Sequence, residues 1–320
     1  MIGAREYSIE LLLVLILGGA VAYFGYLGYG LAVSDPGATP FSGAQAMLYV
    51  EEQMNLGYRV AGTEAADAFQ ELVVPKLTSN FWNVVIQPFV ISEGKQGRNI
   101  IATNRKEVDG TPVVIVGTHY DSRIFADFDS EPENRLLPAP GANSGASGPA
   151  ILLELARTLK LEEIDYGICL IFFDASDNAG IQGWEAAEGS THFVESLGTQ
   201  EELARCATPQ AAVIIDMVGS SDQLSYERGS NLAVVDTLRQ AAVTADEIGW
   251  ISEEPGPLYN GDHIPFLKIS VPAVYLWDSA YPHRGTVADT AAALDAENLQ
   301  RTGVVLKKWL EEGGLGYDPR

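Results

Sequence analysis

The chain has 320 residues and a mass of 34.4 kDa, and its 47% hydrophobic and 20% charged residues are typical of a folded globular protein. It carries 43 acidic and 20 basic residues, which gives a formal charge of −23. This balance argues against a nucleic-acid-binding protein, which would present a basic surface, and against attraction to anionic lipids. It allows cationic substrates or a saline environment but requires neither.

Cysteine and histidine are scarce, and this limits the chemistry open to the chain. Cys169 and Cys206 are too few for a disulfide framework or a cysteine-based zinc site. They could form one disulfide, but two buried thiols are the expected state. Any chemistry that depends on imidazole must draw on four histidines, namely His119, His192, His263 and His283.

The N-terminal region is predicted to be a membrane anchor. After a short segment at residues 1–10, Leu11 to Ser34 contains no charged residue. At about 1.5 Å per helical residue, such a run can cross a hydrocarbon core of about 30 Å. Tyr23, Tyr26 and Tyr29 lie near its far end, as is typical of a membrane interface.

A cleaved signal peptide is the alternative interpretation of this region. Leu11 to Leu17 would be its apolar core, and Ala20-Val21-Ala22 would be its cleavage site. The apolar run continues past that site, which favours the anchor. We therefore expect a single-pass protein of the cell membrane with an extracytoplasmic domain, or else a secreted protein after cleavage.

Downstream of a predicted linker at residues 35–43, residues 44–315 form one predicted domain. Helices are expected where apolar residues recur every three or four positions, and strands where β-branched or aromatic residues form runs. The expected helices are Ala44 to Leu56, Thr63 to Leu77, Ser147 to Lys160 and Asn298 to Leu310. The expected strands are Val84 to Ile91, Asn99 to Thr103, Pro112 to Gly117, Tyr166 to Asp174, Ala211 to Asp216 and Pro272 to Trp277.

Alternation of helices with buried strands predicts an α/β fold, a three-layer αβα sandwich with a mostly parallel mixed central sheet. In such sheets the functional residues follow the carboxyl ends of the strands. Polar residues stand at those positions after three of the expected strands, namely His119, Asp121, Asp174, Asp177 and Asp216.

Eight collinear segments carry a family resemblance. They are Gly117-Thr-His119-Tyr-Asp121-Ser-Arg123, Pro132-Glu-Asn-Arg135, Pro140-Gly-Ala-Asn-Ser144-Gly-Ala-Ser-Gly148, Leu152-Leu-Glu-Leu-Ala-Arg157, Phe172-Phe-Asp174-Ala-Ser176-Asp177, Asp216-Met-Val-Gly219, Gly261-Asp-His-Ile-Pro-Phe-Leu267 and Tyr281-Pro-His-Arg-Gly285-Thr-Val-Ala-Asp289-Thr290. Together they resemble the M28 family of zinc peptidases, and within it the glutaminyl-peptide cyclotransferase branch. The resemblance spans about Ala44 to Leu310 and implies that family's fold.

The resemblance also implies a zinc site and a general base. Catalytic zinc takes nitrogen and carboxylate ligands and keeps one position open for water or substrate. By resemblance, His119 is the first histidine, Asp121 supports it, and Asp177 and Asp216 are acidic ligands at strand ends. An unligated Glu acts on the zinc-bound water in the peptidases, and in the cyclotransferases it moves a proton from the substrate's α-amine to the leaving ammonia.

Three positions depart from the family's pattern. The metal-bridging Asp is replaced by Ser144, and the general-base Glu is replaced by Ser176. In a gap-free alignment the late ligand His is replaced by Gly285, and His283 could serve only if its loop is rebuilt. Serine is a poor zinc ligand and an inactive base near neutral pH without its own activator. Loss of a general base alone costs about 10²–10⁴ in rate.

Structural roles are open for the remaining polar residues. His119 could be a buried histidine that is hydrogen-bonded to Asp121, and Asp177 and Asp216 could cap loops or helices. Asp262 and His263 are expected to hold the loop of the family's pocket rather than to react.

The favoured hypothesis is a non-catalytic, membrane-tethered M28-like domain that binds a peptide or a protein partner, with zinc weakly bound or absent. The alternative is an active zinc-dependent aminopeptidase or glutaminyl-peptide cyclotransferase, with a site rebuilt from His119, Asp177, Asp216 and His283. A third hypothesis is a structural subunit of a membrane assembly, which predicts a large exposed apolar patch.

Overall fold

The computed structural model describes residues 17–18, 39–104, 112–221 and 223–313. The chain divides into two compact units, Met1–Pro40 and Phe41–Arg320, and the elements discussed below belong to the second. The predicted anchor at Leu11 to Ser34 lies outside the described residues, apart from Leu17 and Gly18. Among the residues that are described, no helix combines the length and the apolar character needed to span a bilayer.

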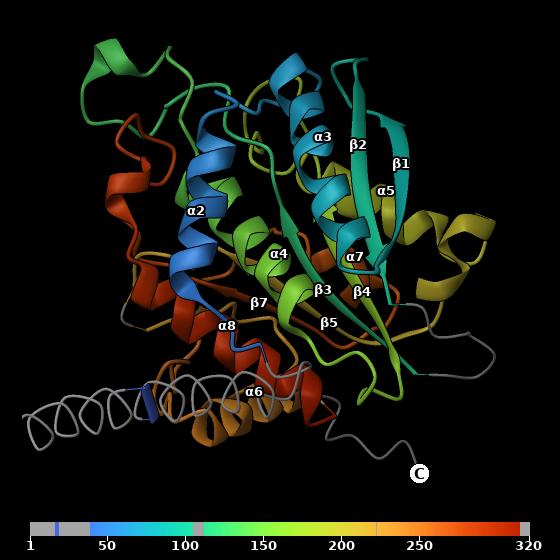
Figure 1. Cartoon of the computed structure of the whole chain (residues 1–320). Helices are drawn as coiled ribbons and strands as arrows, with labels where there is room; N and C mark the ends of the chain where they lie inside the picture. Colours follow the sequence, from blue (N-terminus) through green and yellow to red (C-terminus); the bar gives the residue numbers. More distant parts are fainter. Residues whose placement is uncertain (1–16, 19–38, 105–111, 222, 314–320) are drawn as a thin grey trace, which may run out of the picture. The chain divides into compact units, whose positions relative to one another are not determined.

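A seven-stranded mixed sheet with the strand order β1-β2-β4-β3-β5-β7-β6 forms the centre of the domain (Figure 1). The strands are β1 (Asn83–Val90), β2 (Gln96–Thr103), β3 (Val113–His119), β4 (Gly167–Phe173), β5 (Pro209–Asp216), β6 (Ser225–Tyr226) and β7 (Ala273–Trp277). The ladders β4-β3, β3-β5 and β5-β7 are parallel, whereas β1-β2, β2-β4 and β6-β7 are antiparallel. The prediction of a mixed sheet is therefore confirmed, but its parallel part is confined to the four central strands.

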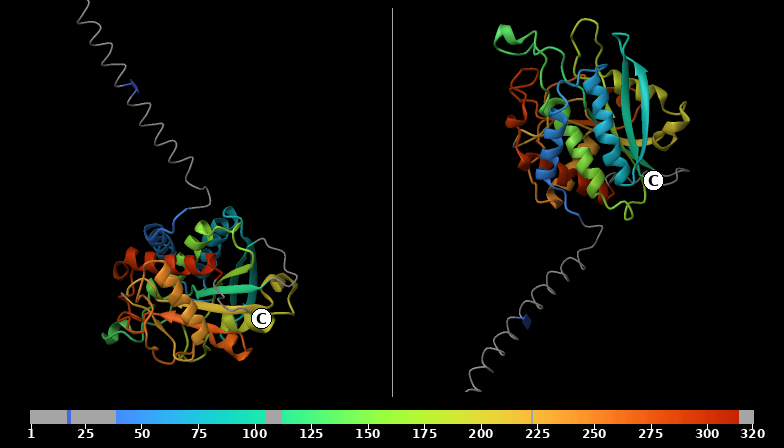
Figure 2. Two further views of the ribbon diagram at one scale, coloured as in Figure 1. Left: turned by 90° about the horizontal axis from the view of Figure 1, so that it is seen from below. Right: turned by 45° about the horizontal axis from the view of Figure 1, so that its top comes forward.

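Helices cover both faces of this sheet (Figures 1 and 2). The α-helices are α2 (Gly43–Met54), α3 (Glu64–Ser79), α4 (Gly148–Thr158), α5 (Glu188–Ser196), α6 (Leu232–Thr244), α7 (Ile264–Lys268) and α8 (Ala296–Glu311). Shorter helical turns are η1 (Pro132–Asn134), η2 (Asn143–Ser147), η3 (Glu201–Cys206) and η4 (Ala291–Ala293).

The alternation of side chains along each strand divides the apolar residues into two main cores. Val114 and Val116 of β3 pack into the core shared with α2, α3, α4, α6 and α8. Val113 and Ile115 of the same strand pack into the core shared with α5, α7 and η3. Because both faces of the strand are buried, its residues 113–117 are all apolar, as the run at 112–117 predicted.

Four of the described helices, α2, α3, α6 and α8, begin at residues whose side chains cap the helix; at α8 the Asp295 carboxylate accepts the Glu297 amide. The Ser42 hydroxyl accepts the Gln45 amide at the start of α2, and the Thr63 hydroxyl accepts the Ala66 amide at the start of α3. Asn231 does the same for Val234 in α6. Such caps satisfy amide groups that have no partner within the helix, and they stabilise it by about 1 kcal/mol each.

The two cysteines form a disulfide between β4 and η3, so the expectation of two buried thiols was wrong. The Sγ atoms of Cys169 and Cys206 are 1.98 Å apart, and their Cα atoms are 6.2 Å apart. Cys169 points to the sheet face on which η3 packs, and both residues belong to the same apolar core. The packing of η3 on this face therefore places the two side chains within bonding distance.

A candidate ligand site at the carboxyl ends of the parallel strands

The carboxyl ends of β4, β3, β5 and β7 meet at one edge of the sheet. His119, Asp216 and Trp277 are the last residues of β3, β5 and β7, and Asp174 directly follows β4. In α/β sheets this edge is where ligands bind. These residues and the segments that follow them form the candidate site.

His119 lies between two aspartates in the buried floor of the site. Its Nδ1 is 3.3 Å from Oδ1 of Asp121, and its Nε2 is 3.3 Å from Oδ1 of Asp216. Burial opposes charging of the ring, but the two aspartates outweigh burial and raise the pKa of His119 well above its usual value. The two aspartates thus favour the protonated form of the ring.

Asp121 holds the segment that follows β4. Its Oδ1 accepts the backbone amide of Ser176 over 3.0 Å, and its Oδ2 accepts that of Asp177 over 3.0 Å. The turn also requires a left-handed residue, and Ala175 fills that position with φ of +56°. The resembled family has glycine there, so the local backbone is retained here at the cost of strain on a Cβ.

The two serines that replace acidic residues are both hydrogen-bonded to carboxylates. The Ser144 hydroxyl donates to Oδ2 of Asp177 over 3.2 Å. The Ser176 hydroxyl donates to Oδ1 of Asp262 over 2.7 Å, and Ser190 donates to the same oxygen over 2.6 Å. Burial is the main cause that raises the pKa of both Asp177 and Asp262. Hydroxyl donors thus occupy the places where carboxylates would repel one another.

The late loop does not bring an imidazole to these aspartates. Gly285 has φ of +61°, and a Cβ there would come within 2.7 Å of the Phe128 ring. The His283 ring packs edge-on against Tyr281 with centroids 5.6 Å apart, and its carbonyl accepts the amide of Thr286. The neighbouring side chain that turns toward the site is that of Arg284.

The Arg284 guanidinium lies against three aromatic rings. Its central carbon is 4.7 Å from the ring centroid of Tyr259 and 5.7 Å from those of Trp277 and Phe128. Asp177 and Asp216 attract this cation, and with Tyr259 they outweigh burial and raise the pKa of Arg284. Sequence reasoning assigned no role to Arg284, although it directly precedes the position of the lost histidine.

Asp216 is stabilised as an anion by several neighbouring groups. Its Oδ2 accepts the hydroxyl of Tyr275 over 2.7 Å, and its Oδ1 faces His119. Burial acts to raise its pKa, but His119, Tyr275 and Arg284 outweigh burial and lower it. Asp216 is therefore ionised near neutral pH, and its lone pairs are engaged by groups of the protein.

Asp289 was also missed by sequence reasoning, although it lies in one of the quoted segments. Its carboxylate accepts the backbone amides of Asn143 and Ser144 over 2.7 and 3.2 Å, and the Tyr281 hydroxyl over 2.8 Å. It thus ties the late loop to the loop that carries Ser144. Burial raises the pKa of Asp289 to about 7.

His263 lies beside the site but bonds away from the aspartates. Its Nε2 is 3.0 Å from Oε2 of Glu227, and burial lowers the pKa of the ring. Glu227 also accepts the backbone amide of Tyr259 over 3.4 Å. This pair supports the loop that carries Tyr259.

The donor set does not fit a catalytic zinc ion. Across residues 17–18, 39–104, 112–221 and 223–313, no three His, Cys, Asp or Glu side chains are arranged so that they could hold a metal. The reason is local: at the three positions that the resemblance assigns to a bridging carboxylate, a general base and a late histidine, the chain has Ser144, Ser176 and Gly285.

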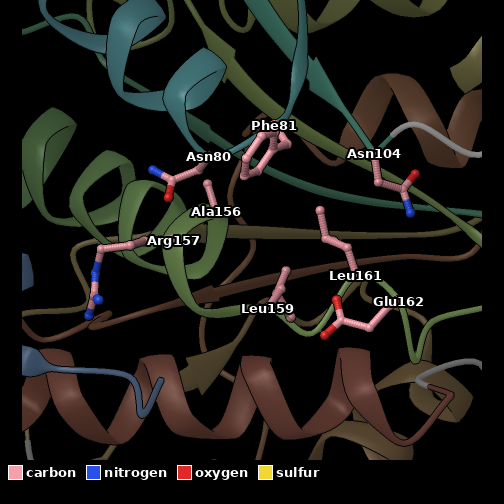
Figure 3. Close-up of a pocket in the computed structure, with 8 residues that line it drawn as sticks. All are labelled: Asn80, Phe81, Asn104, Ala156, Arg157, Leu159, Leu161 and Glu162. Atoms are coloured by element: carbon pink, nitrogen blue, oxygen red, sulfur yellow. The ribbon is translucent and has the colours of Figure 1, made fainter. Parts of the chain in front are cut away.

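A separate cavity of about 430 Å³ lies at the opposite edge of the sheet (Figure 3). Its lining comes from the end of α3, the residue after β2 and the end of α4 with the loop that follows, namely Asn80, Phe81, Asn104, Ala156, Arg157, Leu159, Leu161 and Glu162. Asn104 donates to the carbonyl of Tyr166, which precedes β4, so this cavity lies at the amino ends of the parallel strands. It contributes nothing to the candidate site.

Comparison with known proteins gives the same family throughout. A family model described as Peptidase family M28 matches residues 99–310. The chain is 28% identical over 221 residues to aminopeptidase YwaD of Bacillus subtilis, a match that covers 64% of this chain but only 42% of that protein. It is 23% identical over 310 residues to the glutaminyl-peptide cyclotransferase of Drosophila melanogaster, covering 86% of this chain and 83% of that protein.

Solved structures agree with the sequence comparisons. The glutaminyl cyclase of Porphyromonas gingivalis superposes with a TM-score of 0.77 at 25% identity, covering 86% of this chain and 100% of that chain. A Zn-dependent exopeptidase from Parabacteroides distasonis gives a TM-score of 0.76 at 24% identity, covering 86% of this chain and 99% of that chain. At 24% identity, the likeness to the exopeptidase shows a shared fold alone.

Proposed function

The chain belongs to peptidase family M28, and on this premise we propose that it is a non-catalytic member of the family that binds a peptide or protein partner. The proposed binding site is the group of side chains at the carboxyl ends of the parallel strands, the edge at which ligands bind in α/β sheets. We further propose that the domain is tethered to the cell membrane by residues 11–34 and faces outward.

The observation that carries the proposal is the internal pairing of the site. Ser144 and Ser176 donate to Asp177 and Asp262, and His119 is shared by two aspartates. These side chains are thus already hydrogen-bonded to one another within the protein. A site without a general base and without a Lewis acid loses both main sources of rate in metal-assisted hydrolysis.

Exposed apolar side chains near the pocket support a binding role. Phe128 packs on Arg284 and is 54% exposed, and Leu258, which precedes Tyr259, is 73% exposed. Leu136 and Leu137 follow in the same loop region as Phe128 and are exposed as well. Exposed apolar residues around a polar pocket are common where proteins bind peptides or other proteins.

The disulfide supports the proposed location outside the cytoplasm. Structural disulfides form and persist in oxidising compartments and are rare in the cytosol. The Cys169–Cys206 bond is consistent with export by either an anchor or a cleaved signal peptide. Labelling of intact cells with a membrane-impermeant reagent would test the outward orientation.

Metal content and turnover together test the proposed function. The full-length chain would be purified in mild detergent without chelator, its zinc counted by elemental analysis, and aminopeptidase and N-terminal glutaminyl substrates assayed. We expect near-zero zinc, with no gain after zinc is added, and no turnover. One or two zinc ions per chain, with turnover that disappears in Asp177→Ala, would overturn the proposal in favour of an active enzyme with a rebuilt site.

A further inference from the structure

A continuous aromatic wall surrounds the Arg284 guanidinium. The rings of Tyr259 and Trp277 stack on each other with centroids 4.8 Å apart, and Tyr275 packs against both at 5.2 and 5.8 Å. Phe128 approaches the same guanidinium from its own loop, which follows β3. Flat aromatic faces attract a planar, weakly hydrated cation such as guanidinium.

Negative charge lies on the strand-end side of this wall. Asp216 and Asp177 both attract Arg284, while Tyr275 links the wall to Asp216 through its hydroxyl. In the part of the chain that the structure describes, Arg284 has no carboxylate within ion-pair distance, so the attraction acts across the pocket. The pocket thus combines aromatic faces for the plane of a cation with nearby anions for its charge.

Three other arginines among the described residues contact aromatic rings, and each pairs directly with a carboxylate. One of them, Arg123, lies 4.9 Å from the same Phe128 ring and pairs with Asp127. Arg301 lies 5.5 Å from Trp250 but pairs directly with Glu247 and Glu297, and Arg239 lies 5.2 Å from Tyr226 and pairs with Asp236. Each of them contacts one ring, whereas Arg284 contacts three. The enclosure of Arg284 is therefore more than the ordinary stacking of a surface arginine.

We infer that the pocket walled by Tyr259, Trp277 and Phe128 and faced by Asp177 and Asp216 is a guanidinium-binding site whose occupant is the chain's own Arg284. The inference rests on the proposed function, because a resident guanidinium supplies the positive charge of the site only if no metal ion does. An incoming partner with an arginine or another alkylguanidinium group would have to displace Arg284 to use this pocket.

Truncation of Arg284 followed by rescue with a small guanidinium tests this inference. Arg284→Ala and Arg284→Ser would be made in the full-length chain, with Arg301→Ala as the matched control. Melting temperature and tryptophan fluorescence would be followed during titration with ethylguanidinium and, separately, ethylammonium, both at low millimolar concentration. We expect both Arg284 variants to melt below the wild type and to recover roughly 2–4 °C with ethylguanidinium at saturation.

The same titrations should leave the wild type and Arg301→Ala unchanged, and ethylammonium should rescue less than ethylguanidinium. If both Arg284 variants fold but their melting temperatures do not respond to ethylguanidinium, the inference would be overturned. The same holds if ethylguanidinium raises the melting temperature of Arg301→Ala by as much as it raises theirs. Zinc counted on the same wild-type sample separates the two proposals. A zinc-free protein without rescue keeps the proposed function and removes the guanidinium site, whereas bound zinc removes the proposed function itself.

Discussion

The Ser144 hydroxyl donates a hydrogen bond to Oδ2 of Asp177 over 3.2 Å, at the position where the resembled family carries a metal-bridging aspartate. A hydroxyl in that place satisfies Asp177 without adding a negative charge. Asp289 and Asp216 lie close by, and all of these groups are buried. The substitution therefore suits a site that holds no metal cation to offset clustered carboxylates.

This pairing predicts that Ser144→Asp destabilises the protein through its charge. A fourth carboxylate beside Asp177, Asp216 and Asp289 should lower the free energy of unfolding by about 1–3 kcal/mol near pH 8. Ser144→Asn is the matched neutral control, because asparagine and aspartate have nearly the same volume. Urea denaturation of both variants provides the comparison, and equal stability of the two would contradict the charge explanation.

Gly285 provides a second prediction, which concerns the lost histidine. Gly285→Ala should lower the free energy of unfolding by about 1–2 kcal/mol, because φ is +61° and the new Cβ would meet the Phe128 ring at 2.7 Å. The double variant with Phe128→Ala removes the contact but keeps the backbone strain. A double-mutant cycle by chemical denaturation separates the two causes. If Gly285→Ala leaves the free energy of unfolding unchanged, this loop can readily accept a side chain.

The disulfide should contribute strongly to stability. Cys169 and Cys206 are separated by 37 residues, and a loop of that length predicts a stabilisation of about 4 kcal/mol. Equilibrium urea unfolding with and without reductant measures it. The wild type should lose stability on reduction, whereas the Cys169→Ala/Cys206→Ala double variant should not respond. Identical wild-type midpoints under both conditions would refute this contribution.

Asp289 predicts a pH dependence of stability. Burial raises the pKa of Asp289 from 3.8 to about 7, so between those pH values the folded protein holds a proton that the unfolded chain has released. Stability from this group is therefore present at low pH and is lost as the pH rises toward 7, by up to about 1.4 kcal/mol per pH unit. Above pH 7 the group adds no further change.

The comparison that isolates Asp289 uses Asp289→Asn. Asparagine keeps one side-chain oxygen, but the NH2 group that replaces the second oxygen cannot accept the hydrogen bond from the Ser144 amide. The variant should therefore be less stable than the wild type at pH 5. The difference from the wild type should shrink between pH 5 and pH 8, since the variant has no proton to lose. A difference that is the same at both pH values would mean that Asp289 titrates normally.

The regular elements followed from local patterns where the pattern was strong. The expected strand at Ala211 to Asp216 became β5 at Pro209–Asp216, and the expected helix at Ser147 to Lys160 became α4 at Gly148–Thr158. No helix was predicted at α6, although Asn231 caps it and its apolar residues recur at helical spacing. By contrast, α7 has five residues, too few for any periodicity to be visible.

The candidate site divides in the same way between local and distant information. The identities of Ser144, Ser176 and Gly285 could be read directly from the sequence, since each follows from one position within a recognisable segment. The contacts that these residues make could not be read from the sequence. The partner of Ser176 is 86 positions away at Asp262, and the loop of Ser144 is held from 145 positions away by Asp289.

The sequence by itself determined the family and the mixed α/β class, because both are encoded in short segments and their order. Only the tertiary structure decided that Cys169 pairs with Cys206 and that Arg284 enters an aromatic pocket formed by Tyr259 and Trp277. Such pairings depend on how separate loops pack at the ends of the strands. Packing is a property of the whole fold, and no single stretch of residues contains it.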